Sequence, residues 1–122
     1  LLEKAAQSHV EDMNSSGRYL AHTGSDGSSP GDRIKAAGYA AAWHDSGNGS
    51  LHYVRQENAA YGQNSAAEVV DGWMNSSGHR AAIMDPRTEE IGVGFEIDDV
   101  SGATYWIQTF GIPWSPGDTR YF

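Results

Sequence analysis

Two stretches of the chain place apolar residues at the spacing of an amphipathic helix. The first covers residues 2–13, and its apolar positions are Leu2, Ala5, Ala6, His9, Val10 and Met13. The second covers residues 66–75, and its apolar positions are Ala66, Val69, Val70, Trp73 and Met74. Because an apolar stripe of this kind has to be covered by other apolar surface, each segment is predicted to pack one face against a core.

The second of these helices carries further local signals. Ser65 and Glu68 have the Ser-x-x-Glu spacing of a capping box, which marks the start of the helix. Gly72 lies inside it, where glycine costs about 1 kcal/mol relative to alanine. We interpret Gly72 as a place where another backbone approaches the helix closely.

Two shorter helices are predicted from their end signals. Ser29-Pro30 reads as an N-cap serine followed by proline at the first helical position, and Gly38 ends that helix. A second short helical run covers Arg80–Met84, and Pro86 closes it.

Strand patterns occupy the rest of the chain. Near the end, Ile91, Val93, Phe95 and Ile97 alternate with Gly92, Gly94 and Glu96, which predicts a strand with one buried face. Residues 98–102 make a turn, and residues 105–110 return as its partner. An earlier β-hairpin is predicted from Tyr39–His44 and Leu51–Gln56, which flank the turn residues 46–49. Helices and antiparallel strands in this order indicate an α+β domain, with a helical layer on each face of a small antiparallel sheet.

Composition excludes several classes of protein. The 122 residues suit a single domain, 1–122, that is large enough to fold without a metal or disulfide. A net charge of −8, with no cluster of Lys or Arg, argues against nucleic-acid binding. No apolar run is long enough to span a membrane, and the chain has no cysteine. We expect a monomer. Because the chain opens in helical pattern without an initiator Met, we also expect that any signal peptide has been removed.

Five histidines are candidates for chemistry, at positions 9, 22, 44, 52 and 79. Their spacing alone does not match a zinc motif. His9 lies on an apolar helix face and is expected to be a hydrogen-bonded core residue, while His44 and His52 flank the hairpin turn and are expected to face solvent. His22 and His79 differ because both lie in loop sequence rich in Gly and Ser.

Glu57 is a further candidate, either by itself or as a member of a catalytic triad. Glu57 stands where the hairpin strand is expected to end, and either binds a ligand or accepts backbone hydrogen bonds that organise a loop. Ser76, His79 and Glu57 could also compose a nucleophilic triad. The triad is the weaker interpretation, because no Gly-x-Ser-x-Gly motif is present and a polar helix end accounts for Ser76.

Residues 69–84, VVDGWMNSSGHRAAIM, resemble the signature of bacterial CAP domains, the SCP-like superfamily of cysteine-rich secretory proteins, venom antigens and plant pathogenesis-related proteins. Further motifs agree with it in order: SHVEDM at 8–13, YLAHTG at 19–24, ENAAYG at 57–62, IGVG at 91–94 and YWIQTFG at 105–111. The resemblance covers nearly the whole chain. It implies a three-layer α-β-α sandwich and a location that is extracellular or in the cell envelope.

The resemblance also implies a ligand site. His22 and His79 take the two histidine positions, which in the family can hold a divalent metal, and Glu57 takes the position of the first glutamate. Ser76 replaces the second glutamate, so the expected ligand-binding set is His22, Glu57, Ser76 and His79, with one carboxylate fewer. Imidazole ligands favour Zn²⁺ over Ca²⁺ or Mg²⁺, which prefer many oxygens.

These observations lead to three hypotheses about function. The first is a secreted binding domain whose cleft takes a divalent metal and a small or lipid-like ligand. The second is a hydrolase of peptidase or esterase type, in which a metal on His22 and His79 activates water and the catalytic residues are Glu57, as base, and His79. The third is a non-catalytic interaction module of the cell envelope.

Overall fold

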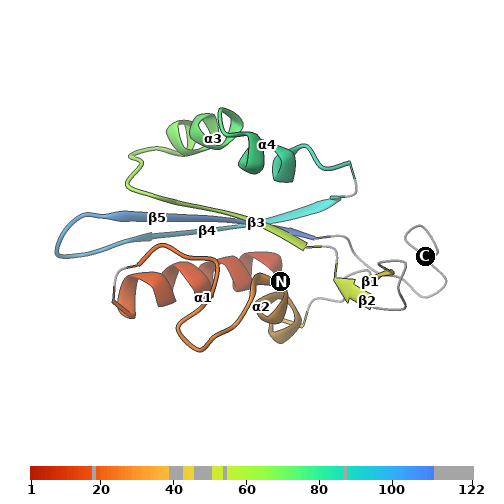
Figure 1. Cartoon of the computed structure of the whole chain (residues 1–122). Coiled ribbons are helices and arrows are strands. Elements are labelled where there is room, and N and C mark those ends of the chain that lie inside the picture. Colours follow the sequence, from red (N-terminus) through yellow and green to blue (C-terminus); the bar gives the residue numbers. More distant parts are fainter. Residues whose placement is uncertain (18, 39–42, 46–50, 54, 87, 112–122) are drawn as a thin grey trace.

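The fold is a three-layer sandwich with a small antiparallel sheet in the middle. A computed structural model describes residues 1–17, 19–38, 43–45, 51–53, 55–86 and 88–111. Its elements are α1 (Leu2–Ser15), α2 (Pro30–Ala36), β1 (Trp43–Asp45), β2 (Leu51–Tyr53), β3 (Arg55–Tyr61), α3 (Ala66–Met74), α4 (Ser77–Ile83), β4 (Glu90–Ile97) and β5 (Thr104–Gly111). Helices α1 and α2 lie on one face of the sheet and α3 and α4 on the other (Figure 1), which confirms the predicted α-β-α architecture. None of the described helices has the length and apolar character needed to cross a membrane.

The central sheet has the order β3-β5-β4, and both contacts are antiparallel. Strand β5 lies in the middle and is buried along most of its length. Strands β1 and β2 form a separate antiparallel pair in which His44 stands opposite His52, so a hairpin is confirmed here. Residues 39–42, 46–50 and 54, which include the expected turn, lie outside the described residues. The predicted second strand, Leu51–Gln56, is divided, because residues 55 and 56 pair with β5 as part of β3.

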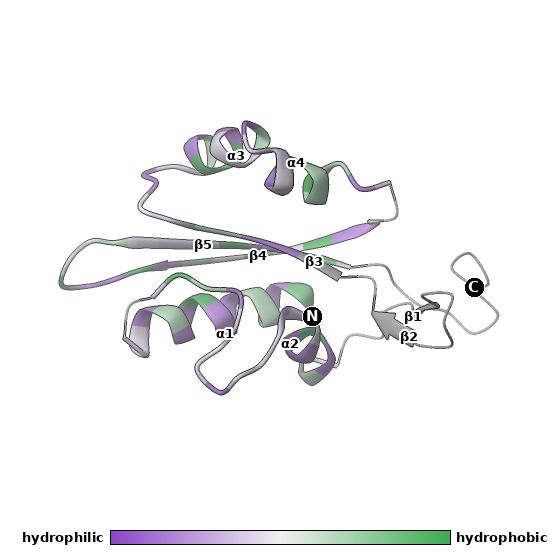
Figure 2. Ribbon diagram, viewed as in Figure 1, coloured by the Kyte–Doolittle hydropathy of each residue, from purple (hydrophilic) through white to green (hydrophobic). Residues whose placement is uncertain are grey.

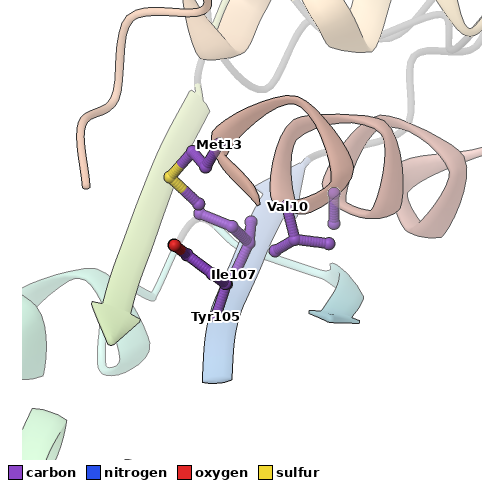
Figure 3. Close-up of a cluster of buried hydrophobic side chains, with 5 residues drawn as sticks. Val10, Met13, Tyr105 and Ile107 are labelled. Carbon is purple, nitrogen blue, oxygen red and sulfur yellow. The ribbon is translucent and has the colours of Figure 1, made fainter. Parts of the chain in front are cut away.

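Helix α1 supplies one half of the main core. All six residues of its predicted apolar face are buried. Val10 and Met13 meet Tyr105 and Ile107 of β5 (Figure 3), and these four side chains are fully buried. Burying side chains of this size is worth about 1.5–3 kcal/mol each, which accounts for the attachment of α1 to the sheet. The hydropathy colouring shows apolar residues in green and polar residues in purple alternating along α1 (Figure 2).

The contact between α1 and β4 reverses the predicted orientation of that strand. The apolar residues Ile91, Val93, Phe95 and Ile97 were expected on the buried face, yet they are 38–53% exposed. Gly92 and Gly94 are buried instead. A Cβ atom on Gly94 would lie 2.6 Å from the carbonyl carbon and oxygen of Ala6, and one on Gly92 would overlap the backbone of Leu2 and Glu3. The glycine face is therefore the inner face because it lets the helix backbone lie directly on the strand.

Helices α3 and α4 cover the other face of the sheet with fewer side chains. Val69 and Trp73 are buried against Ala60 of β3, whereas Val70 remains 40% exposed, so the apolar stripe is narrower than predicted. The Ser65 hydroxyl caps α3 as expected, and the Glu68 carboxylate accepts from the N–H of Asn64. The expected close approach at Gly72 is wrong, because a Cβ atom there would meet no atom within 4 Å.

Substitution by alanine should have opposite effects on the free energy of unfolding at Gly94 and at Gly72, because only Gly94 is in close contact with another backbone. Gly94→Ala forces α1 away from β4 and should lower the free energy of unfolding by about 2 kcal/mol or more. Gly72→Ala adds a methyl group in open space inside a helix and should raise it by about 1 kcal/mol. Urea unfolding of both variants measures the difference. Equal effects of the two substitutions would contradict the close packing of α1 on β4.

Candidate functional site

The segment between α1 and α2 carries His22 and is bound to α1 through Asp12. The Asp12 carboxylate accepts hydrogen bonds from the N–H of Ser25 at 2.8 Å, from the Ser25 hydroxyl at 2.5 Å and from the Tyr19 hydroxyl at 3.0 Å. Burial opposes ionisation of Asp12, but the hydrogen bonds from Ser25, Ser16 and Tyr19 hold its pKa below the ordinary value. Asp12 is therefore a charged anchor for this segment.

Arg33 binds the same segment from α2. One terminal nitrogen of its guanidinium donates to the carbonyl of His22 at 2.8 Å and to Oε1 of Glu57 at 3.0 Å. The other donates to the carbonyl of Ser28 at 2.9 Å. The Arg33 side chain is only 9% exposed. One buried cation thus joins α2, the segment that bears His22, and strand β3.

Glu57 is the acceptor at the centre of this arrangement. It lies within β3 rather than at a strand exit, because β3 continues to Tyr61 along its partner β5. Its carboxylate is 2% exposed, with Oε1 on Arg33 and Oε2 on Nδ1 of His22 at 2.8 Å. A buried ion pair of this kind is weak evidence of stabilisation, but removing one partner leaves an uncompensated buried charge.

Contact with Glu57 determines which nitrogen of His22 is available. A carboxylate only accepts hydrogen bonds, so Nδ1 carries the proton and Nε2 of the neutral ring keeps its lone pair. The side chain is 56% exposed, which leaves the ring accessible. The hydrogen bond that His22 donates to Glu57 raises the pKa of His22 above its ordinary value of 6.5, against the opposing effects of partial burial and of the positive charge of Arg33.

His79 is held near the start of α4. Its Nδ1 lies 2.8 Å from the hydroxyl of Ser76, the N-cap residue of that helix. Its carbonyl accepts a hydrogen bond from the side-chain amide of Asn58 at 3.1 Å, and Asn58 is buried. Helix α4 begins at Ser77, earlier than the predicted Arg80, so Ser76 and His79 belong to one helix start.

The expected site residues are brought to one strand but not into one cluster. His22 contacts Glu57 and His79 contacts Asn58, so the two histidines are held against consecutive residues of β3. The contact with Asn58 is to the main-chain carbonyl of His79, so it fixes the start of α4 on β3 and not the direction of the imidazole ring. Among the described residues, no three His, Asp or Glu side chains form a group able to hold a metal ion. The triad of Ser76, His79 and Glu57 is not assembled, since the Glu57 oxygens bind His22 and Arg33.

Of the other three histidines, His9, His44 and His52, the structure describes the side chain of His9. His9 is fully buried, and its Nε2 lies 2.6 Å from the carbonyl oxygen of Ala21, as expected for a core histidine. Burial lowers its pKa, so the ring is neutral. The side chains of His44 and His52 lie outside the described part of the structure.

Sequence reasoning missed three residues that organise the site: Asp12, Arg33 and Asn58. The only local signal is at Arg33, which follows a strong helix start in which Ser29 and Asp32 cap one another. An arginine one position after such a cap, on a helix this short, is close enough to the preceding loop to bind its carbonyls. Asp12 and Asn58 belong to the motifs SHVEDM and ENAAYG, but nothing in those motifs indicates which groups they bind.

A groove of about 520 Å³ lies beside this arrangement, between α1, α2 and residues 25–28. Its lining combines the small side chains of Ala5 and Ala36 with charged Lys4 and Asp26. Arg33 also lines it, whereas His22, Glu57 and His79 do not. The groove and the histidine site thus share Arg33.

Comparison with known sequences finds a matching family and a relative. The model of the family described as CAP, the cysteine-rich secretory protein family, matches residues 2–110. The chain is 34% identical over 109 residues to "Uncharacterized protein YkwD" of Bacillus subtilis (strain 168). That match covers 89% of this chain and 36% of the relative, so the chain spans about a third of the relative's length.

Comparison with solved structures supports the same fold. An extracellular protein containing an SCP domain from Bacillus anthracis (strain Ames) superposes with a TM-score of 0.72 at 22% identity, covering 90% of this chain and 31% of that protein. An outer surface protein from Borrelia burgdorferi superposes with a TM-score of 0.72 at 24% identity, covering 93% of this chain and 74% of that protein.

The buried ion pair predicts a specific loss of stability. Arg33→Met leaves the Glu57 carboxylate buried without its cation and should lower the free energy of unfolding by about 3 kcal/mol. Lys35→Met removes a cation from an exposed position of the same helix and should leave stability close to wild type. Urea unfolding at pH 7 compares them. Similar midpoints for both variants would show that the Arg33 contact does not support the fold.

The raised pKa of His22 predicts how its effect on stability depends on pH. Because the folded pKa lies above the unfolded value, the stabilisation by the protonated ring is complete below 6.5 and is lost as pH rises through the folded pKa. The stability difference between wild type and His22→Ala should therefore shrink over that range. NMR titration of the imidazole signals gives the pKa directly. A pKa of His22 at or below 6.5 would refute the charge contact with Glu57.

Proposed function

The chain belongs to the CAP family of cysteine-rich secretory proteins, and from this premise we propose that it acts outside the cytoplasm as a binding domain that holds a divalent transition metal through His22 and His79. The observation that carries the proposal is the contact of His22 Nδ1 with the buried Glu57 carboxylate at 2.8 Å. A carboxylate behind a histidine is the usual arrangement that orients an imidazole for a metal.

The chemistry of both histidines supports this proposal. Each ring uses Nδ1 for a hydrogen bond, His22 to Glu57 and His79 to Ser76, so with respect to the described residues Nε2 is the nitrogen left for a ligand in each case. Two neutral imidazoles suit Zn²⁺ or a similar ion, with water completing the coordination. Calcium and magnesium fit poorly, because the set offers too few oxygen ligands.

Glu57 orients His22 in this proposal and does not act as a base. Its carboxylate is 2% exposed and both oxygens are hydrogen bonded, so activating a water molecule would require it to give up Arg33 or His22. The hydrolase hypothesis, with Glu57 as base and His79 as its partner, has no comparable support in the geometry. The role as an interaction module is compatible with metal binding, since a bound metal adds a rigid, charged surface feature.

The location outside the cytoplasm rests on the solved relatives. One is described as an extracellular protein and the other as an outer surface protein. The domain is negatively charged overall, which disfavours contact with anionic polymers.

The groove between α1 and α2 is the place proposed for a small organic ligand. Its volume of about 520 Å³ is within the usual range for small-molecule sites. The lining is more apolar than polar, with alanines beside charged Lys4 and Asp26, which suits a small ligand that has an apolar part and a charged group. Because Arg33 lines the groove and holds His22, a ligand there would contact the residue that organises the histidine site.

Zinc should stabilise the folded protein. At roughly 100 times its dissociation constant, Zn²⁺ would add about 2.7 kcal/mol, which differential scanning fluorimetry detects as a rise in Tm. The rise should be larger at pH 8 than at pH 6, because the proton on His22 competes with the metal and its pKa is raised. His22→Ala and His79→Ala should each remove it.

The control is His44→Ala, which should keep the full response to zinc. A response that persists in both site variants, or that disappears in His44→Ala, would place the metal elsewhere and contradict the proposal. An equal rise with Ca²⁺ would contradict the imidazole assignment.

A further inference from the structure

The groove between α1, α2 and residues 25–28 carries an excess of negative charge. Its charged lining residues are Lys4, Asp12, Asp26, Asp32 and Arg33. The charge of Arg33 is already matched, because its guanidinium lies 3.0 Å from Oε1 of the buried Glu57 carboxylate. Asp32 is occupied in capping the start of α2. The described lining therefore retains two carboxylates against one cation, Lys4.

The two remaining carboxylates, Asp12 and Asp26, are bound by neutral donors. Asp12 accepts hydrogen bonds from Ser25 and Tyr19, and Asp26 accepts one from the N–H of Ser28 at 2.9 Å. Burial opposes ionisation of Asp12, but its hydrogen bonds keep its pKa below the ordinary value, and the hydrogen bonds from Ser28 lower the pKa of Asp26. The negative charge of Asp12 repels that of Asp26. A cation near both would relieve this repulsion.

A buried histidine adds an acceptor to the same groove. His9 lines the groove, its side chain is fully buried, and burial lowers its pKa, so the ring is neutral. Its Nε2 lies 2.6 Å from the carbonyl oxygen of Ala21, which only accepts, so Nε2 carries the proton. Nδ1 then keeps a lone pair, to which no group of the described residues donates. This lone pair disfavours an anion and favours an occupant with hydrogen-bond donors.

We propose that the groove binds a small organic ammonium ion, with its charged nitrogen beside Asp26 and its apolar part on Ala5 and Ala36. The proposal rests on the ligand-binding role proposed for the groove and names the chemical class of the ligand. An ammonium ion has the charge opposite to the excess in the groove, and its N–H groups are donors that the Asp26 carboxylate can accept. A carboxylate ligand carries the wrong charge and has no donor to offer.

NMR titration of the ¹⁵N-labelled protein at pH 7 and low salt tests the class of ligand. The three probes are hexylammonium, hexanol and hexanoate, which share one alkyl chain and differ in charge. Hexylammonium should shift the amide signals of Ser8 and Ala36, which line the groove, and should bind at least about threefold more tightly than either other probe. Added salt should reduce this preference, because it screens the charges of the groove.

Two substitutions at exposed positions should change the affinity for hexylammonium in opposite directions. Asp26→Asn removes one negative charge and keeps an oxygen for the N–H of Ser28, so it should weaken binding about threefold. Lys4→Met removes the opposing cation and should strengthen binding by about the same factor. The control is Asp71→Asn on α3, which lies on the other side of the sheet and should leave the affinity unchanged.

Different results overturn different parts of the proposal. If none of the three probes binds, the groove is not a ligand site, and the role proposed for it fails as well. If hexanol or hexanoate binds as tightly as hexylammonium, the groove keeps its role as a ligand site but the ammonium class is wrong. If Asp26→Asn and Lys4→Met both leave the affinity unchanged, the ammonium ion binds elsewhere and the inference is wrong.

Discussion

The contact between Arg33 and Glu57 is the interaction on which the rest of the site depends. Both side chains are nearly excluded from water, at 9% and 2% exposed. Buried charges are tolerated only when their partners are in place, so α2, β3 and the segment that bears His22 have to assemble together. A guanidinium suits this role because its fixed set of donors reaches Glu57, the His22 carbonyl and the Ser28 carbonyl at once. The orientation of His22 is a consequence of that assembly.

The second constraint is the direct packing of α1 on β4. Gly92 and Gly94 allow the helix backbone to lie on the strand without intervening side chains. Two contacts follow from the position of this one helix. Asp12 reaches the segment that carries His22, and the Gln7 side chain reaches the backbone of Phe95 in β4. The same close packing accounts for the exposed apolar face, because the inner face of β4 belongs to the glycines.

Features that depend on residues close together in the sequence could be predicted from it, whereas features that depend on residues far apart in the sequence could not. The apolar face of α1 and the Ser29 cap depend on neighbours in the chain, and both were predicted correctly. The buried face of β4 was predicted wrongly, because alternation reveals two faces but not which one meets a helix. The Arg33–Glu57 pair joins residues distant in sequence, and no local pattern indicates it. His22 and Glu57 were found through family motifs, and the structure adds that Glu57 lies behind His22 rather than beside a ligand.

Glu57, held by Arg33, determines which nitrogen of the neutral His22 ring carries the proton. Long-range ¹H–¹⁵N NMR, recorded above the pKa of His22, reports which ring nitrogen carries the proton. The hydrogen bond to Glu57 predicts the Nδ1–H form, in which Nε2 keeps the lone pair that binds a metal. The Nε2–H form, or the mixture found for a free histidine, would contradict it.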